Sequence, residues 1–319
     1  MDVSDKYAGK RKKRRYIPGL AALKFKIEKD WEIDEAKALY ESAKFKIKVD
    51  KIIYEDCIKG MKKLPDNSID LVIADPPFGI NFNGKGTQYN RNSDLVIDGY
   101  NEIKDNYEEF TEKWISQIPR ILKETASIFI FSGWTNLKDI LNALDNTGLT
   151  TINHIIWKYQ FGVFTRKKFV TSHYHILFAV KNPKKYFFNK IEHYPLDVWE
   201  IPRKYKPNEP KNSTKLPEEL IFKIIDFCSQ PGDLILDPFI GNGTTAVCAK
   251  SKFRHFIGFE INENLKPIIN KNINSVKIGE HYRPYNTFLP TKEEIFKKYP
   301  NLKRIFTKNQ LELKVNKNK

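Results

Sequence analysis

Two short segments of this sequence combine residue types that can do chemistry together. The first is the tetrapeptide Asp75-Pro76-Pro77-Phe78, which directly follows the apolar run 70–74. An amino group on a nucleic acid base is a poor nucleophile, because its lone pair is delocalised into the ring. The Asp75 carboxylate and the rigidly held Pro76 carbonyl can accept both amino hydrogens and localise that lone pair. Phe78 can stack on a base rotated out of a duplex. Taken alone, the tetrapeptide fits equally well a turn that ends a strand.

The second segment is a turn between an apolar strand and a helix. It reads Asp237-Pro238-Phe239-Ile240-Gly241-Asn242-Gly243 and continues into Thr244-Thr245. The glycines let a ligand approach the backbone, and the first N–H groups of the helix face the same point. The turn lacks the Walker A lysine and the third glycine of a dinucleotide fingerprint, and it suits a carboxylate better than a pyrophosphate. Glu260 ends the next strand, where an acid can bind both ribose hydroxyls. A site for a nucleoside that carries a carboxylate indicates S-adenosylmethionine. The alternative interpretation of this segment is an ordinary tight turn between a strand and a helix, followed by a surface Glu.

The cysteines and histidines indicate neither a metal site nor a thiol nucleophile. Carbon-5 methylation of cytosine needs a cysteine that usually follows proline, and Cys57, Cys228 and Cys248 do not. Three scattered cysteines are also too few for a disulfide framework or a zinc knuckle. His173 and His175 share one face of a predicted strand, but no third ligand candidate lies near them in the sequence. We therefore predict no metal, and a structural or DNA-facing role for this pair.

The pattern between these segments predicts an α/β fold in which helices wrap a parallel sheet, since short apolar runs alternate with helical periodicity from Asp50 onward. Residues 182–212 interrupt it with five prolines and read as an irregular insertion. The run 175–180 is predicted to pair antiparallel with the strand before it. Strands are predicted at 51–54, 70–74, 127–131, 151–157, 175–180, 233–236 and 255–259, and helices at 33–45, 107–122, 136–146, 217–228 and from 244 onward.

Both segments, in this order, resemble the motifs of a known enzyme family. Ala74 to Phe78 resembles the catalytic motif of amino-methylating DNA methyltransferases, and Asp237 to Thr245 resembles their cofactor motif. The catalytic motif precedes the cofactor motif, as in the beta class of restriction-modification methyltransferases. The resemblance covers about residues 50–274. It implies a Rossmann-like S-adenosylmethionine-dependent sheet with circularly permuted motif order, in which the strands that end at Asp75 and Asp237 are neighbours.

The resemblance also implies roles for two further segments. Tyr54-Glu55-Asp56-Cys57 resembles the segment that contacts the cofactor adenine, with Asp56 as acceptor. Lys215-Leu216-Pro217 resembles the segment near the methionine moiety. The sequence departs there from the commoner His-Pro-Thr-Gln-Lys-Pro form, having Asn212-Ser213-Thr214 before Lys215.

The charge of the chain points to a polyanionic partner. Lys and Arg outnumber Asp and Glu by 55 to 39, which gives +16 and a pI near 9.4. No apolar run is long enough to span a membrane, and we expect a cytoplasmic protein.

Basic and aromatic residues are interleaved at about 160–212, which is predicted to be a target-recognition insertion, or alternatively a solvated basic surface. The loop 79–94, with Lys85, Tyr89 and Arg91, is expected to close over the flipped base. We divide the chain into a basic N-terminal arm (1–49), a catalytic domain (50–274) and a C-terminal extension (275–319).

Several functional alternatives remain at the level of sequence. The favoured function is methylation of adenine N6 in double-stranded DNA, because Asp in the first motif position is commoner among adenine enzymes; cytosine N4 is the alternative. An RNA or protein acceptor, and a non-catalytic DNA-binding protein, are further alternatives. We expect a monomer or homodimer, with a cognate restriction endonuclease as a possible partner.

Overall fold

One mixed β-sheet organises the chain. The computed structural model describes residues 19–77, 106–160, 162, 165–203 and 215–305. Within these ranges, eight strands form a sheet in the order β1-β8-β7-β2-β3-β5-β4-β6. The strands are β1 (Lys51–Ile53), β2 (Ile69–Ala74), β3 (Leu122–Ser132), β4 (Thr150–Lys158), β5 (His173–Val180), β6 (Val198–Glu200), β7 (Leu234–Asp237) and β8 (His255–Phe259).

Strand direction brings distant parts of the chain to one edge of this sheet. β1, β8, β7, β2 and β3 pair in parallel, β5 is antiparallel to both β3 and β4, and β6 is parallel to β4. All described strands except β5 therefore point the same way. Their carboxyl ends share one edge, and at such an edge open α/β sheets bind their ligands.

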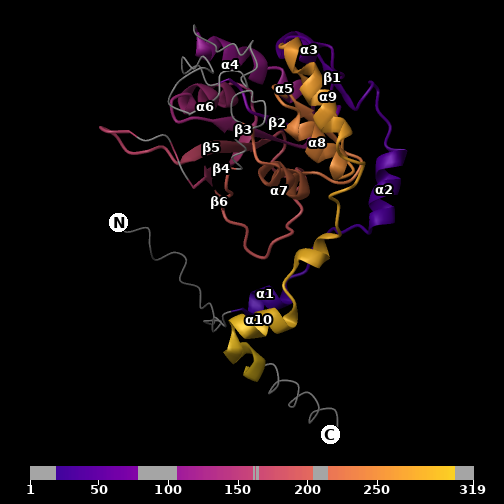
Figure 1. Ribbon diagram of the computed structural model, residues 1–319, viewed down its shortest axis with the longest axis vertical. Coiled ribbons are helices and arrows are strands. Elements are labelled where there is room, and N and C mark those ends of the chain that lie inside the picture. The colour runs from indigo at the N-terminus through magenta and orange to yellow at the C-terminus, as the bar shows by residue number, and fades with distance from the viewer. Residues whose placement is uncertain (1–18, 78–105, 161, 163–164, 204–214, 306–319) are drawn as a thin grey trace, which may run out of the picture.

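The central strand β2 is buried on both faces because every residue of Ile69–Ala74 is shielded from solvent. Side chains alternate between the faces of a strand. Leu71 and Ile73 pack with residues of α7, α8 and α9, whereas Val72 and Ala74 pack with residues of α3, α4, α5 and α6. Two helical layers thus enclose the sheet (Figure 1). The helices are α1 (Leu20–Lys24), α2 (Ile33–Ser42), α3 (Cys57–Lys62), α4 (Tyr107–Ile115), α5 (Ile118–Ile121), α6 (Leu137–Asp145), α7 (Glu218–Cys228), α8 (Thr244–Ser251), α9 (Lys266–Asn274) and α10 (Lys292–Lys298), with 3₁₀ turns at Glu263–Leu265 and Tyr285–Phe288.

Most predicted elements are confirmed, including the antiparallel pairing of β5 with β4. Three differ. The predicted helix 107–122 is divided into α4 and α5, the latter containing Pro119, which cannot donate a backbone hydrogen bond. The strand predicted at 127–131 extends from Leu122 to Ser132. The insertion predicted to be irregular contains the short strand β6. This strand is stabilised by pairing with β4 and has no strand pattern of its own in the sequence.

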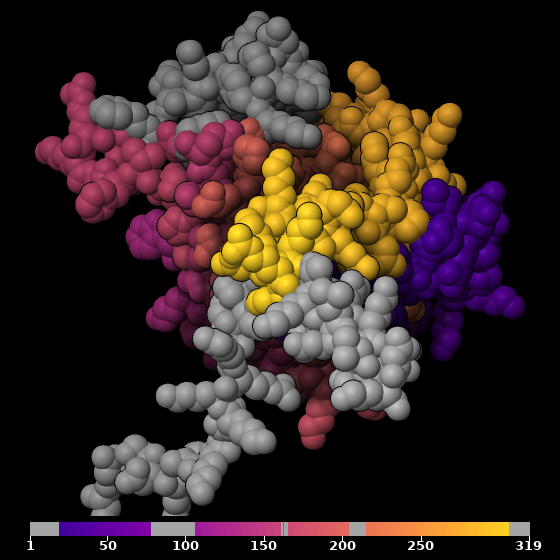
Figure 2. All heavy atoms as spheres, turned by 90° about the horizontal axis from the view of Figure 1, so that it is seen from below, coloured from indigo at the N-terminus to yellow at the C-terminus, as the bar shows by residue number. Residues whose placement is uncertain are grey.

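Segments from the two ends of the chain pack together against the α8–β8 turn. Trp31 and Ala36 are buried with Phe253, Tyr282 and Tyr285, and the Tyr282 hydroxyl donates to the Trp31 carbonyl at 2.8 Å. The part of the predicted N-terminal arm that the structure describes therefore contributes to a small core. α1 and α10 lie together below the sheet (Figure 1), and Figure 2 shows the yellow C-terminal residues across the middle of that lower face. The boundaries at 49/50 and 274/275 stay predictions, and Lys10 to Arg15 lie outside the described residues.

Candidate active site

Asp75 and Asp237 lie side by side at the carboxyl edge of the sheet. β2 pairs with β7 through Leu71 with Ile235 and Val72 with Leu236, so both aspartates leave the sheet at neighbouring positions. Pro76 and Pro77 follow Asp75 and take the chain out of the ladder, because proline cannot donate to it. Burial raises the pKa of Asp75 to about 7, the nearby Asp237 adds to this effect, and Arg203 opposes it. Phe78 lies outside the described residues, as do Lys85, Tyr89 and Arg91.

The turn after β7 is held in shape by the Asp237 carboxylate. Its Oδ1 accepts a hydrogen bond from the Phe239 backbone N–H at 2.9 Å, and its Oδ2 accepts one from the Thr245 hydroxyl at 2.6 Å. Burial raises the pKa of Asp237 to about 7, and these two hydrogen bonds lower it. Gly241 and Gly243 have φ angles of 50° and 83°, in the left-handed region that favours glycine. The turn thus delivers the chain directly into α8, which begins at Thr244.

The side chains of the turn have separate roles. The Phe239 ring packs edge-on against Trp114 of α4, with centroids 5.3 Å apart, so it anchors the turn to the opposite helical layer. Pro238 is buried. At Gly241, an added Cβ would meet no heavy atom closer than the Phe239 carbonyl oxygen at 3.8 Å. Space for a ligand therefore exists at Gly241, whereas the neighbouring side chains fix the loop.

Glu260 and the end of β1 complete the same edge. The Glu260 backbone N–H donates to the Ile53 carbonyl at 3.1 Å, and its carboxylate accepts from the Asn262 backbone at 2.8 Å. Burial raises the pKa of Glu260. Burial also raises the pKa of Tyr54, and the charges of Glu260 and Glu263 raise it further, so its hydroxyl lies near both acids.

Asp56 and Cys57 sit at the start of α3. Asp56 Oδ1 accepts a hydrogen bond from the Lys59 backbone at 2.9 Å and caps the helix. Cys57 is buried, and burial raises the pKa of its thiol to about 12, with smaller contributions from Asp56 and Asp237. A thiol of that pKa is protonated at neutral pH, so it serves as a packing group near Asp237 and not as a nucleophile.

Lys215 lies just before α7, and its ammonium pairs with Glu218 at 3.5 Å. Its charge acts on Cys248 of α8, which places it beside the helix that follows the glycine turn. The structure therefore brings Lys215 to the flank of α8, with its own partner one turn away. Its neighbours 212–214 lie outside the described residues.

The described residues of this edge fit S-adenosylmethionine. The buried Tyr54 hydroxyl and the buried Asn242 Oδ1 have no hydrogen-bond partner within the described ranges. Each is a polar group that would be costly to leave unsatisfied, and each lies on a segment that reaches the same edge as Glu260. Carboxylates suited to ribose hydroxyls, a glycine turn and the free N–H groups of α8 together match a nucleoside joined to an amino acid.

Sequence reasoning missed Arg203 as a functional candidate. Its guanidinium carbon lies 4.0 Å from the centre of the Tyr159 ring, 4.9 Å from Tyr174 and 5.2 Å from Trp157. Arg203 follows β6, the strand that sequence analysis did not predict. The interleaving of basic and aromatic residues was the available signal, but only strand pairing assembles this set.

A third histidine, distant in the sequence, lies beside the pair His173 and His175 in the structure. His154 on β4 faces His175 on β5, with its Nε2 2.7 Å from His175 Nδ1. Strand pairing across 21 residues brings the rings together, which linear spacing cannot reveal. Burial, followed by the charges of His154 and His173, lowers the pKa of His175 to about 4. No group of three potential ligands with metal-binding geometry occurs in the described part of the chain.

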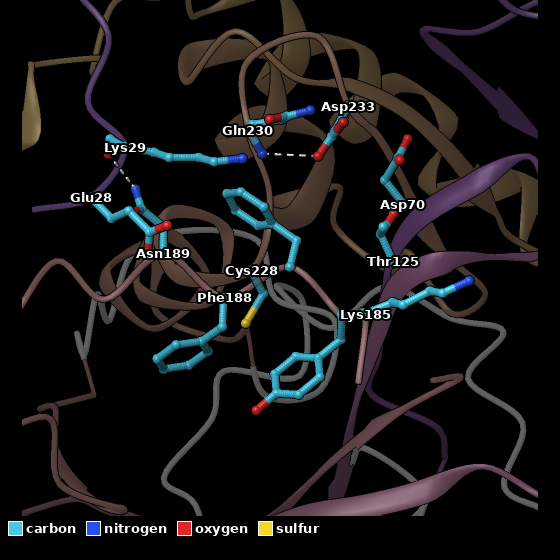
Figure 3. Close-up of a pocket in the computed structure, with 12 residues that line it drawn as sticks. Glu28, Lys29, Asp70, Thr125, Lys185, Phe188, Asn189, Cys228, Gln230 and Asp233 are labelled. Carbon is cyan, nitrogen blue, oxygen red and sulfur yellow. Dashed lines mark hydrogen bonds between the residues drawn. The ribbon is translucent and has the colours of Figure 1, made fainter. Parts of the chain in front are cut away.

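A separate pocket of about 370 Å³ lies at the opposite, amino edge of the sheet (Figure 3). Asp70 at the start of β2 and Asp233 before β7 line it, together with residues of the segments 28–29 and 185–189. Asp70 Oδ2 accepts from Lys123 Nζ at 2.7 Å and from the Leu234 backbone at 3.0 Å. None of the predicted site residues lines this pocket, so it is distinct from the candidate active site.

The sheet order and the carboxyl-edge turn define a Rossmann-like S-adenosylmethionine-dependent methyltransferase. Residues 69–271 match the family model described as DNA methylase, covering the N6 and N4 amino-methylating enzymes. The chain belongs to this family of amino-methylating DNA methyltransferases. No helix in the described part of the chain is long and apolar enough to cross a membrane.

Two relatives support membership of this family, and two solved structures share the fold. It is 32% identical over 246 residues to the type II methyltransferase M.HinfI of Haemophilus influenzae, covering 71% of this chain and 68% of the relative. It is 31% identical over 273 residues to the DNA adenine methyltransferase YhdJ of Escherichia coli (strain K12), covering 76% and 87%. The M1.HpyAVI–SAM complex shares the fold with a TM-score of 0.52 and 22% identity, covering 70% of this chain and 99% of the other. The cytosine-N4-specific PvuII DNA methyltransferase does so with 0.54 and 15%, covering 73% and 98%.

Proposed function

We propose that this chain methylates N6 of adenine in double-stranded DNA, with Asp75 as the residue that activates the acceptor. The observation that carries the proposal is the adjacency of Asp75 and Asp237 at the carboxyl ends of β2 and β7, where acceptor and cofactor must meet. Adenine is favoured because YhdJ is named a DNA adenine methyltransferase. Aspartate at the first motif position agrees with that preference.

Asp75 and Pro76 act on the acceptor amino group. The Asp75 carboxylate accepts one amino hydrogen and the Pro76 carbonyl accepts the other, which directs the nitrogen lone pair away from the ring. The carboxylate must be ionised for this, and its raised pKa makes that ionisation depend on pH near neutrality. Phe78 stacks on the flipped base in this proposal.

The cofactor is held by residues of three neighbouring strand ends. When bound, S-adenosylmethionine supplies the electrophilic methyl group. We assign the ribose hydroxyls to Glu260, the adenine to the Asp56–Cys57 segment, and the amino acid end to the glycine turn and the start of α8. Lys215 is assigned to the same end from its place beside α8. The full set of proposed cofactor residues is Asp56, Cys57, Lys215, Asp237, Pro238, Phe239, Gly241, Gly243, Thr244, Thr245 and Glu260.

We assign DNA recognition to the part of the segment 160–212 that reaches the carboxyl edge of the sheet, because within that segment β5 is a strand of the sheet and residues 185–189 line the pocket at the opposite edge. Its described part carries Arg166, Lys167 and Lys168 beside Phe169, whose side chain is 99% exposed. Basic groups of this kind contact phosphates, and an exposed aromatic ring can contact bases. We further propose a cytoplasmic monomer or homodimer that works beside a cognate endonuclease. Sedimentation of the protein and a cleavage assay on methylated DNA test these points.

The experiment offers labelled S-adenosylmethionine with double-stranded DNA, RNA or protein, and then identifies the methylated nucleoside by mass. We expect N6-methyldeoxyadenosine. N4-methyldeoxycytidine would replace the adenine assignment, and no transfer to DNA would refute the proposed function. Asp75→Ala should slow transfer at least about 10²-fold while cofactor affinity is retained, since one charge-assisted contact to the reacting group is lost. Asp145→Ala, at the exposed end of α6, is the matched control and should behave as wild type.

A further inference from the structure

Two guanidinium nitrogens of Arg203, Nε and Nη2, are buried without a hydrogen-bond partner among the described residues. Three aromatic rings surround the guanidinium, from Trp157, Tyr159 and Tyr174. Ring faces stabilise a cation but do not accept its N–H groups in the ring plane. Leaving such buried donors unsatisfied is costly, so we expect them to meet an acceptor at another stage of the reaction.

The backbone around Arg203 is firmly placed. Its N–H donates to the Gln160 side-chain oxygen at 2.9 Å, and its carbonyl accepts from the Gln160 side-chain nitrogen at 2.9 Å. Two residues earlier, the Ile201 carbonyl accepts from the Trp157 indole at 2.8 Å. These contacts tie the chain after β6 to the carboxyl end of β4. Arg203 therefore reaches the same sheet edge as Asp75 from the side opposite the cofactor strands.

The charge of Arg203 acts on Asp75 directly. Among the described residues, Asp237 and Arg203 are the charged groups whose fields change the pKa of Asp75, one raising it and the other lowering it. Asp237 belongs to the cofactor half of the site. Arg203 therefore lowers the pKa of Asp75, which Asp237 raises.

We propose that Arg203 is a positioning residue of the acceptor pocket, whose guanidinium pairs with the Asp75 carboxylate during methyl transfer and keeps it charged and aimed at the acceptor amino group. The aromatic rings of Trp157, Tyr159 and Tyr174 fix the plane of the guanidinium. A guanidinium suits this task because its planar donors match a carboxylate. The inference rests on the proposed catalytic role of Asp75. A contact between Arg203 and a DNA phosphate is the competing explanation.

Two substitutions separate the charge of Arg203 from its shape. Arg203→Gln retains a planar amide for stacking but loses the charge, whereas Arg203→Lys retains the charge without the planar group. The matched control is Lys158→Met, which removes an exposed cation paired with Glu200 on the neighbouring strand. Cofactor affinity, measured by calorimetry, should be unchanged in all three variants. It also reports whether each variant is folded.

The decisive measurement is the single-turnover rate of DNA methylation as a function of pH, at saturating DNA and cofactor. For Arg203→Gln we expect the rise of the rate with pH to move up by about one pH unit or more, which lowers the rate at pH 7 about fivefold or more and leaves the rate in alkali unchanged. Arg203→Lys and Lys158→Met should keep the wild-type pH profile.

If the pH profile of Arg203→Gln is unshifted and its DNA binding is weaker, Arg203 contacts a phosphate and the proposal is overturned. Wild-type kinetics in that variant would also overturn the proposal. If Arg203→Gln does not fold, a shifted pH profile in Arg203→Lys would still contradict the role of the charge. A wild-type protein that does not methylate DNA at all would refute the proposed function instead.

Discussion

The carboxyl groups of Asp75 and Asp237 lie close enough across the β2–β7 pair for the charge of one to raise the pKa of the other. Burial contributes more to the pKa of Asp75 than this repulsion does, and each of the two carboxyl groups has a pKa of about 7. The cofactor-binding and acceptor-binding halves of the site are therefore electrostatically linked. A change in charge at the cofactor turn therefore changes the pKa of Asp75, the residue that activates the acceptor.

The first prediction concerns the pH dependence of methylation. Because Asp75 accepts an amino hydrogen only in its ionised form, and burial favours its neutral form, the rate should rise with pH through about 7. Asp237→Asn removes the repelling charge, which lowers the pKa of Asp75, so the rise should begin at lower pH. Single-turnover rates at saturating cofactor measure both profiles. If the wild-type rate rises with pH around the ordinary pKa of a carboxyl group instead, this assignment is contradicted.

The second prediction concerns cofactor affinity. Glu260 is mostly buried at the end of β8, whereas Glu263 lies a few residues beyond it, at the start of a 3₁₀ turn. Loss of hydrogen bonds from two ribose hydroxyls to a charged group should cost about 2–4 kcal/mol, so Glu260→Ala should weaken binding at least about 30-fold. Glu263→Ala is the control and should bind within a few-fold of wild type. Calorimetric titration with S-adenosylmethionine compares them, and equal losses would remove Glu260 from the site.

The third prediction concerns the backbone of the cofactor turn. Gly243 has a φ of 83°, and an added Cβ would lie 3.2 Å from Ile269 Cγ2. Gly148 has a φ of 75° but open space around it, so it isolates the cost of the backbone conformation. Gly148→Ala should lower the free energy of unfolding by about 1–2 kcal/mol. Gly243→Ala should lower it further and weaken cofactor binding. Urea denaturation measures both, and a smaller loss in Gly243→Ala would contradict the crowding.

Local sequence predicted the catalytic half of this architecture well, for a physical reason. A strand that is apolar from Leu71 to Ala74 and is followed by Asp75 and two prolines is typical of a buried parallel position. The same holds for the strand that ends at Asp237, since the glycine turn after it has few alternatives. The neighbouring placement of Asp75 and Asp237 followed from the family resemblance and is confirmed.

Most of the features that the sequence did not predict depend on contacts between residues that are distant in the sequence. β6 is three residues long and is held by backbone pairing with β4, so no local periodicity predicts it. Arg203 and its aromatic rings, and the approach of His154 to His175, arise from the same β4–β5–β6 region. The residues 253–285 that pack on Trp31 are likewise far from it in sequence.

The last prediction concerns the amino edge of the sheet, where Asp233 lines the pocket in Figure 3. Burial raises the pKa of Asp233 to about 7, and the charge of Asp70 adds to this. The folded state therefore binds the Asp233 proton more tightly than the unfolded state, so the contribution of Asp233 to wild-type stability falls as pH rises from about 4 to about 7.

Asp233→Asn cannot ionise, and its side-chain oxygen can still accept from the Gln230 backbone, a contact of 2.9 Å in the wild type. The substitution should be nearly neutral at pH 3.5 and should raise the free energy of unfolding by about 1–3 kcal/mol at pH 8. Asp145→Asn, on the exposed end of α6, provides the control and should show no such growth with pH. Denaturant unfolding at both pH values compares the variants. A constant difference across pH would mean that Asp233 is already ionised without cost in the folded protein.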